Sequence, residues 1–190
     1  MPYNMSENQN GRRRGNLGRQ TLKARSYRPE TDEGVVVEFY LDLIRGHYRL
    51  WSELVGEHHD AEHWEQVLVR EEAGEKWARE LRKRLKDPDS LLLIFTLDRD
   101  EPVGFLHLEI RKDPLIFSKK GFISEIFLHP DFRGRGYSRQ MLAWGERWFH
   151  EKGVSPRHVY VTSNNLAAVK LYASMGYRVT DYRMTKIGNF

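Results

Sequence analysis

One stretch of the chain joins an apolar run to a helical pattern through a segment rich in glycine and arginine. Residues 121–128 (GFISEIFL) have the composition of a buried strand, and apolar residues recur at helical spacing after Ser138. Between them lies RGRGYS, residues 133–138. Small residues at a strand-to-helix junction let successive backbone N–H groups converge, and the positive end of the helix adds to their field. The junction therefore predicts a diphosphate site, with Arg133 and Arg135 as permanent cations beside it.

The motif differs from the two commonest phosphate loops, because neither GxxxxGK[ST] nor GxGxxG matches it. It resembles instead the pyrophosphate loop of the GNAT superfamily of acyl-CoA-dependent N-acetyltransferases, which reads Q/R-x-x-G-x-G/A after a strand ending in a V-x-P type sequence. Arg133, Gly136 and Ser138 occupy the three defining positions, after Leu128-His129-Pro130. Ser138 departs from the usual Gly or Ala, but it is small enough for the backbone to approach the phosphates.

A second segment strengthens this resemblance. Residues 165–177 (NLAAVKLYASMGY) are similar to the family pattern N-x-x-A-x-x-x-Y-x-x-x-G-F/Y, and they follow the first motif in the expected order. The two motifs place the likeness over roughly residues 90–187, about half of the chain. The resemblance implies acetyl-CoA as a co-substrate and no metal. It also implies an amine acceptor as the second partner, and dimers are common in this superfamily.

The pattern of apolar and turn-forming residues predicts a mixed α/β (α+β) fold in the order β-α-α-β-β-β-α-β-α-β. Strands are expected at 21–27, 91–97, 103–110, 121–128, 158–162 and 177–187, and helices at 32–51, 64–85, 138–152 and 165–175. Asp32 is the expected cap of the first helix. In the GNAT fold this order gives a mostly antiparallel central sheet with helices on both faces.

Charge and length set limits on the remaining function classes. The 190 residues are most simply a polar, disordered basic tail (1–20) and one acetyltransferase domain (21–190). The net charge is +4, but four arginines and one glutamate in the tail account for +3 of it. The domain itself is nearly neutral, so neither a nucleic-acid partner nor a membrane partner is expected. The chain has no cysteine, which excludes a cysteinyl acyl-enzyme and fits a cytoplasmic protein.

Acetyl transfer from a thioester to an amine needs a group that removes a proton from the ammonium group, a group that stabilises charge on the carbonyl oxygen, and a proton for the departing thiolate. Glu125 is the only carboxylate inside an otherwise apolar strand and is the candidate base, with Glu109 on the neighbouring strand as the substitute. Tyr172 is the candidate acid that protonates the departing thiolate; the alternative is an aromatic core residue. The resemblance further implies that the backbone of Ile126, Phe127 and Leu128 binds the pantetheine arm. The diphosphate would lie on Arg133, Gly134, Arg135, Gly136, Tyr137 and Ser138, and Asn165 would contact the cofactor or cap its helix.

The predicted function is therefore transfer of an acetyl group to a primary amine by direct attack in a ternary complex, with a small-molecule acceptor slightly favoured. Two alternatives stay open: acetylation of a protein lysine or N-terminus, and a CoA-binding sensor without turnover. A cluster near the second helix has two further interpretations, a metal site or an acidic rim that attracts a cationic amine. Its members are Glu53, Glu57, His58, His59, Asp60, Glu62 and His63. An ordinary surface is the simplest interpretation of this cluster.

Overall fold

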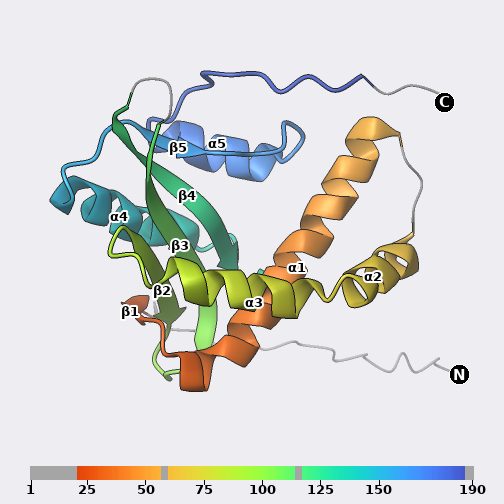
Figure 1. Cartoon of the computed structure of the whole chain (residues 1–190), viewed down its shortest axis with the longest axis horizontal. Helices are drawn as coiled ribbons and strands as arrows, with labels where there is room; N and C mark the ends of the chain where they lie inside the picture. Colours follow the sequence, from red (N-terminus) through yellow and green to blue (C-terminus); the bar gives the residue numbers. More distant parts are fainter. Residues whose placement is uncertain (1–20, 57–59, 114–116, 187–190) are drawn as a thin grey trace, which may run out of the picture.

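The computed structural model describes residues 21–56, 60–113 and 117–186, which form five strands and five α-helices (Figure 1). The strands are β1 (Lys23–Ser26), β2 (Ser90–Thr96), β3 (Pro102–Lys112), β4 (Lys119–Leu128) and β5 (Arg157–Val159). The helices are α1 (Pro29–Val55), α2 (Ala61–Arg70), α3 (Ala73–Arg84), α4 (Tyr137–Glu151) and α5 (Leu166–Ser174). The strands form one sheet in the order β1-β2-β3-β4-β5, antiparallel except for the parallel pair β4–β5.

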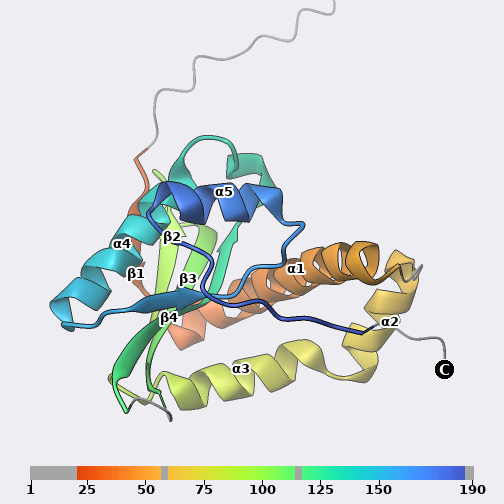
Figure 2. The ribbon, with the colours of Figure 1, turned by 90° about the horizontal axis from the view of Figure 1, so that it is seen from above.

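Helices cover both faces of this sheet, as the sequence predicts (Figure 2). Alternate residues of a strand point to opposite faces. On one face, Leu106 of β3 belongs to a core that includes Met141 of α4. On the other face, Phe105 packs in a second core with Val36 of α1 and Leu81 of α3. The two faces are thus closed by helices far apart in the sequence, and β3 and β4 are buried between them.

The structure has two helices where the sequence predicted one over residues 64–85, so the prediction of a single continuous helix is wrong. Asp60 begins α2 by accepting a hydrogen bond from the backbone N–H of His63 at 2.8 Å. The break lies before α3, where Glu72 adopts a left-handed backbone conformation with φ of 49°. A glutamate rarely adopts this conformation, and nothing in the local sequence signals it. No helix in the described ranges is long and apolar enough to cross a membrane.

The first helix begins three residues before the predicted start. Pro29 occupies its first turn, where the fixed φ of proline suits a helix and its missing N–H is not needed. Asp32 therefore lies inside the helix and does not cap it in the predicted way. Its buried carboxylate still serves the helix N-terminus, because it accepts the backbone N–H of Arg28 at 2.8 Å and pairs with Arg25 at 2.6 Å.

The closing strand predicted over 177–187 is absent from residues 177–186, which have no regular secondary structure. Val179, Tyr182 and Met184 on this segment are 70%, 87% and 92% exposed. A strand requires a neighbour whose backbone groups pair with it, and β5 offers only three residues at this edge. The apolar composition of the segment alone is therefore not enough to add it to the sheet.

Close packing of β3 on β4 yields a stability prediction. Gly104 of β3 lies opposite Leu128, and a Cβ on it would lie 2.4 Å from the carbonyl oxygen of Phe127. We expect Gly104→Ala to lower the free energy of unfolding by about 1–3 kcal/mol. Gly34→Ala is the matched control inside α1, where an added Cβ meets no atom within 4 Å; it should raise stability by up to about 1 kcal/mol. Urea unfolding measures both, and equal effects would contradict this account of the packing.

Candidate functional site

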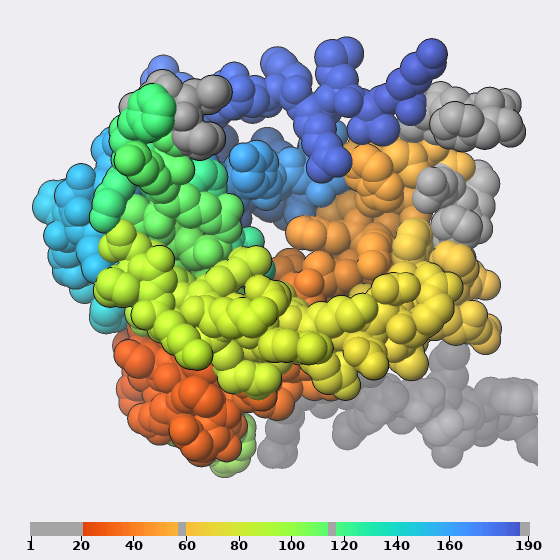
Figure 3. Space-filling model, in the orientation of Figure 1, coloured from red at the N-terminus to blue at the C-terminus, as the bar shows by residue number. Residues whose placement is uncertain are grey.

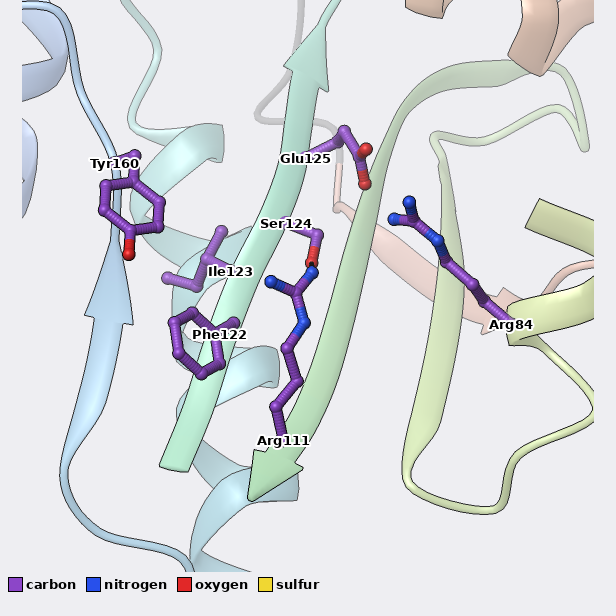
Figure 4. A pocket seen from close by; sticks show the side chains of 7 residues that line it. All are labelled: Arg84, Arg111, Phe122, Ile123, Ser124, Glu125 and Tyr160. Atoms are coloured by element: carbon purple, nitrogen blue, oxygen red, sulfur yellow. Dashed lines mark hydrogen bonds between the residues drawn. The ribbon is translucent and has the colours of Figure 1, made fainter. Parts of the chain in front are cut away.

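The β4 strand loses one of its two neighbours halfway along its length. It pairs with β5 only through Gly121, Phe122 and Ile123, which lie opposite Arg157, His158 and Val159. The strand continues to Leu128, still paired with β3, while the chain after Val159 turns away. Figure 4 shows the two strands separating beyond this point. Within the described part of the chain, the β5-facing edge of residues 124–128 has no strand partner, so its backbone groups can bind an extended ligand.

A bulge turns two successive side chains of β4 toward the same face. His107 is paired with Glu125 and Leu108 with Ile123, so Ser124 is an extra residue in β4. Ser124 contacts Glu109 and Glu125 contacts His107, and these two partners are alternate residues on one face of β3. Without the bulge, Ser124 and Glu125 would point to opposite faces. The bulge therefore places a row of polar groups on the face of the sheet that α3 covers.

Glu125 is held at the inner end of this row by two side chains, one of which is fixed by a third. Its Oε2 lies 2.5 Å from Nδ1 of His107, and the indole Nε1 of Trp77 donates to its Oε1 at 3.4 Å. Nε2 of His107 lies 3.1 Å from the Ser90 hydroxyl. A neutral imidazole with its proton on Nδ1 satisfies both contacts: Nδ1–H donates to Glu125, and Nε2 accepts from Ser90. Glu125 is thus a mostly buried carboxylate whose position is fixed from β2, β3 and α3.

His107 is the main functional residue that the sequence interpretation missed. It is fully buried, whereas a lone histidine in the apolar run of β3 gives little sign of its partner. The available signal was the antiparallel pairing of residues 103–110 with 121–128, which would bring it near Glu125. The bulge at Ser124 shifts that register by one residue, and a bulge cannot be located from alternation alone.

Glu109, the substitute base, is engaged in a different way. Its carboxylate accepts hydrogen bonds from the Ser124 hydroxyl and the Arg111 guanidinium, and Arg84 lies 3.5 Å away. Burial raises the pKa of Glu109, but the hydrogen bonds from Ser124 and Arg111 more than offset it and leave the pKa below its usual value. A carboxylate stabilised in its charged form is a weak base, so these surroundings count against Glu109 as the group that removes the proton.

The predicted phosphate loop has the backbone geometry that its glycines allow. Gly134 and Gly136 have φ of 76° and 82°, in the left-handed region, and α4 begins immediately after them. The first four N–H groups of a helix have no acceptor within the helix, and for this reason helix N-termini such as that of α4 attract anions. Arg133 is tied back toward β4, because its Nε donates to the carbonyl of Leu128 at 2.9 Å. Arg135 extends over the ring of Phe132 at 5.9 Å.

The second motif forms α5. Asn165 caps this helix by accepting the backbone N–H of Ala168 at 3.2 Å, as one of its two interpretations predicts. Tyr172 is 6% exposed and its ring lies 5.7 Å from that of Tyr177, so the core interpretation holds for its ring. Burial raises the pKa of the Tyr172 phenol to about 12. The hydroxyl therefore remains protonated at neutral pH and is available as a proton donor.

The histidine-rich cluster does not assemble into a site among the described residues. Glu57, His58 and His59 lie outside the described ranges. Asp60 is used as the cap of α2, and Glu53 accepts a hydrogen bond from Asn164 at 3.3 Å. No group of three or more histidine, aspartate or glutamate side chains in the described ranges is arranged to hold a metal ion. Two members of the predicted acidic rim, Asp60 and Glu53, therefore already accept hydrogen bonds from other groups of the protein.

Comparison with known proteins identifies the family. The model of the acetyltransferase (GNAT) family matches residues 50–177, about two thirds of the chain. The protein belongs to this family. It is 36% identical to the uncharacterized N-acetyltransferase YdgE of Bacillus subtilis over 91 residues, which are 48% of this chain and 57% of YdgE. It is 30% identical to YycN of the same organism over 106 residues, 56% of this chain and 67% of YycN.

A solved structure gives the same fold. The GCN5-related N-acetyltransferase from Ralstonia eutropha aligns with a TM-score of 0.64 at 20% identity, over 88% of this chain and 99% of that protein. At this identity the likeness concerns the fold alone. The GNAT fold predicted from the sequence is confirmed, although the closing strand is missing and one more helix is present.

The contacts of Glu109 predict a pH effect on stability. Its folded pKa is below the unfolded value, so it stabilises the fold above the unfolded pKa, and this contribution is lost as pH falls through the folded pKa. We expect Glu109→Gln to reduce the loss of unfolding free energy between about pH 6 and about pH 3. Glu75→Gln on the exposed side of α3 removes the same charge and is the control. Urea unfolding across this range measures both, and an unchanged pH dependence in Glu109→Gln would contradict the assignment.

Proposed function

We propose that the protein transfers an acetyl group from acetyl-CoA to a primary amine, by direct attack in a ternary complex. The observation that carries this proposal is the free edge of β4, residues 124–128, which runs from Glu125 to the glycine loop before α4. An extended pantetheine arm paired with Ile126, Phe127 and Leu128 would have its diphosphate at the loop and its thioester toward Glu125. Phe127 and Leu128 are almost fully buried, so this contact would use their backbone atoms.

The diphosphate would lie on the backbone of residues 133–138. Two left-handed glycines and the first turn of α4 supply N–H groups there, and Arg133 and Arg135 supply positive charge. Ser138 adds a hydroxyl at a position where most relatives of this kind carry Gly or Ala. Asn165 is already used as a helix cap, so a contact with the cofactor would involve the remaining donors of its side chain.

Glu125 would remove the proton of the attacking ammonium group, directly or through water. The Nδ1–H of His107 and the indole of Trp77 hold its two oxygens, so the base is oriented before the acceptor binds. The amine nitrogen then attacks the thioester carbonyl, and a backbone N–H of the free β4 edge beside the thioester stabilises the developing oxyanion. As the C–S bond breaks, the thiolate of CoA takes the proton of the Tyr172 hydroxyl.

The acceptor would reach the thioester from the side of α1 and α3. Figure 3 shows the surface hollowed between α1, α3, α5 and the sheet, and Trp77 of α3 contacts Glu125. A small amine fits a site bounded by helices on several sides, which supports a small-molecule acceptor. Acetylation of a protein lysine or N-terminus and CoA binding without turnover are the two rivals. A thiol-release assay with amines and peptides, run beside a CoA-binding measurement, separates all three.

Removal of either proton-transfer group should slow the reaction while the cofactor still binds. We expect Glu125→Gln and Tyr172→Phe each to lower kcat by about a hundredfold or more. The Kd for acetyl-CoA should change by less than about threefold, because neither side chain is proposed to bind the diphosphate. Tyr182→Phe, 87% exposed, is the control for loss of a phenol hydroxyl. Thiol release and calorimetry give the two readouts; a kcat for Tyr172→Phe equal to that of Tyr182→Phe would exclude the acid role.

The phosphate loop can be tested by a pair of glycine substitutions. Gly136 and Gly153 both adopt left-handed φ, 82° and 66°, and an added Cβ meets no atom within 4 Å at either position. Each alanine variant should therefore lose about 1 kcal/mol of stability from backbone strain. Only Gly136→Ala should also weaken acetyl-CoA binding, by about tenfold or more, because only that glycine shapes the proposed cradle. Calorimetry with acetyl-CoA decides, and similar Kd values for the two variants would argue against this location.

A further inference from the structure

A pocket adjoins Glu125 where β4 and β5 separate. The proposed mechanism uses only Glu125 among the residues that line it. The pocket has a volume of about 130 Å³, the space of about four water molecules. Seven residues line it: Arg84, Arg111, Phe122, Ile123, Ser124, Glu125 and Tyr160 (Figure 4). They come from α3, β3, β4 and the chain after β5. The pocket thus shares the candidate base with the catalytic site, and it is large enough for a small polar group.

Two arginines supply the positive charge of this pocket. Arg84 and Arg111 both approach the single carboxylate of Glu109, whose side chain is 12% exposed beneath them. The two guanidinium side chains are themselves 42% and 46% exposed. Glu109 neutralises one of the two cations from below. Glu125, the other carboxylate of the pocket, balances the second cation until an ammonium group binds to Glu125, and the arginines then need a further anion.

The arginines also keep hydrogen-bond donors available. A guanidinium has five N–H donors. Arg84 makes one long contact to Glu109, 3.5 Å from its Nη1. Arg111 contacts Glu109 and Ser124 through Nη2, and its guanidinium lies 4.8 Å above the Phe122 ring. Stacking and hydrogen bonding hold Arg111 in place while its Nη1 and Nε are not used in these contacts, which is a fixed geometry suited to an incoming anion.

We infer that this pocket binds a carboxylate of the acceptor, and that the acceptor is a small amine of the amino-acid type. The inference rests on the proposed transfer to an amine at Glu125. A planar carboxylate matches the fork of a guanidinium. Ser124 and Glu125 are adjacent residues on the same face of the sheet, so an amine at Glu125 has its own carboxylate within reach of Arg111. Phe122, Ile123 and Tyr160 provide an apolar wall for the remaining atoms of a side chain.

The same charges disfavour other small amines. A polyamine or an aminoglycoside would bring further positive charges to two arginines, and like charges at close range reduce affinity. The geometry therefore selects against polycations that an acidic acceptor site would attract. It also favours acceptors small enough for the amine and the carboxylate to fit between Glu125 and Arg111.

The test is acetyl transfer to a panel of free amino acids, each compared with the amine that lacks its carboxylate. Lysine with cadaverine and arginine with agmatine are two such pairs. We expect the wild type to acetylate at least one amino acid with a kcat/KM about tenfold or more above that of its decarboxylated analogue. Arg111→Gln and Arg84→Gln should bring this ratio close to one, mainly through a higher KM for the amino acid. Arg79→Gln, an exposed arginine of the same helix as Arg84, is the control and should keep the ratio.

Three results would overturn the inference: equal rates with and without the carboxylate, a preference for a polyamine or a peptide, or an unchanged ratio in both arginine variants. Both arginines are substantially exposed, so their variants should fold, and thermal unfolding checks this. Acetyl-CoA binding by calorimetry separates the two proposals. Failure of the wild type to bind acetyl-CoA refutes the proposed function, whereas binding and transfer without a carboxylate preference refute only the anion site.

Discussion

The site depends on one constraint, the early end of β5 beside a longer β4. Three residue pairs join these strands, and β4 then continues for five residues with β3 as its partner. Antiparallel pairing with β3 keeps those five residues extended, although their other edge has no neighbouring strand in the described chain. An extended strand with one free edge is a template for another extended chain. A short 3-10 helix, η1 (Pro130–Phe132), and then the glycine loop follow this strand, so the strand also sets the direction in which a diphosphate would lie.

The polar side chains beside this edge can be buried because they form hydrogen bonds with one another. His107 and Glu109 lie on the face of β3 that otherwise packs against apolar helix residues, and burying them unpaired would be strongly unfavourable. Each is matched by a side chain of β4, Glu125 for His107 and Ser124 for Glu109, and the bulge makes both pairings possible. The two carboxylates then differ in their partners. Glu125 faces a histidine and an indole, while Glu109 faces arginines and a hydroxyl. This difference supports the proposal that Glu125 is the base and that Glu109 balances the charge of the arginines.

The sequence predicted the features that depend on local chemistry. Left-handed backbone at the phosphate loop could be anticipated from Gly134 and Gly136, and Glu125 was identified as the one carboxylate in an apolar strand. The groups that sequence reasoning missed depend on pairing between strands: His107 and Arg111 reach β4 only through a register that includes the bulge at Ser124. The strand predicted over 177–187 is absent from its described part, residues 177–186, because a pattern of apolar residues does not show whether a neighbouring edge is long enough to pair with it. The left-handed backbone of Glu72, which separates α2 from α3, was likewise not predicted from the sequence.

The most direct test of the account is hydrogen exchange of the backbone amides with and without acetyl-CoA, read by mass spectrometry or NMR. Binding along the free edge of β4 predicts slower exchange at residues 126–128 and 133–138, with little change on β1 and β2. Amides in these two segments would be protected together, since one ligand would cover both. Protection confined to other parts of the chain, or no protection at saturating acetyl-CoA, would contradict the proposal that this edge and loop bind the cofactor.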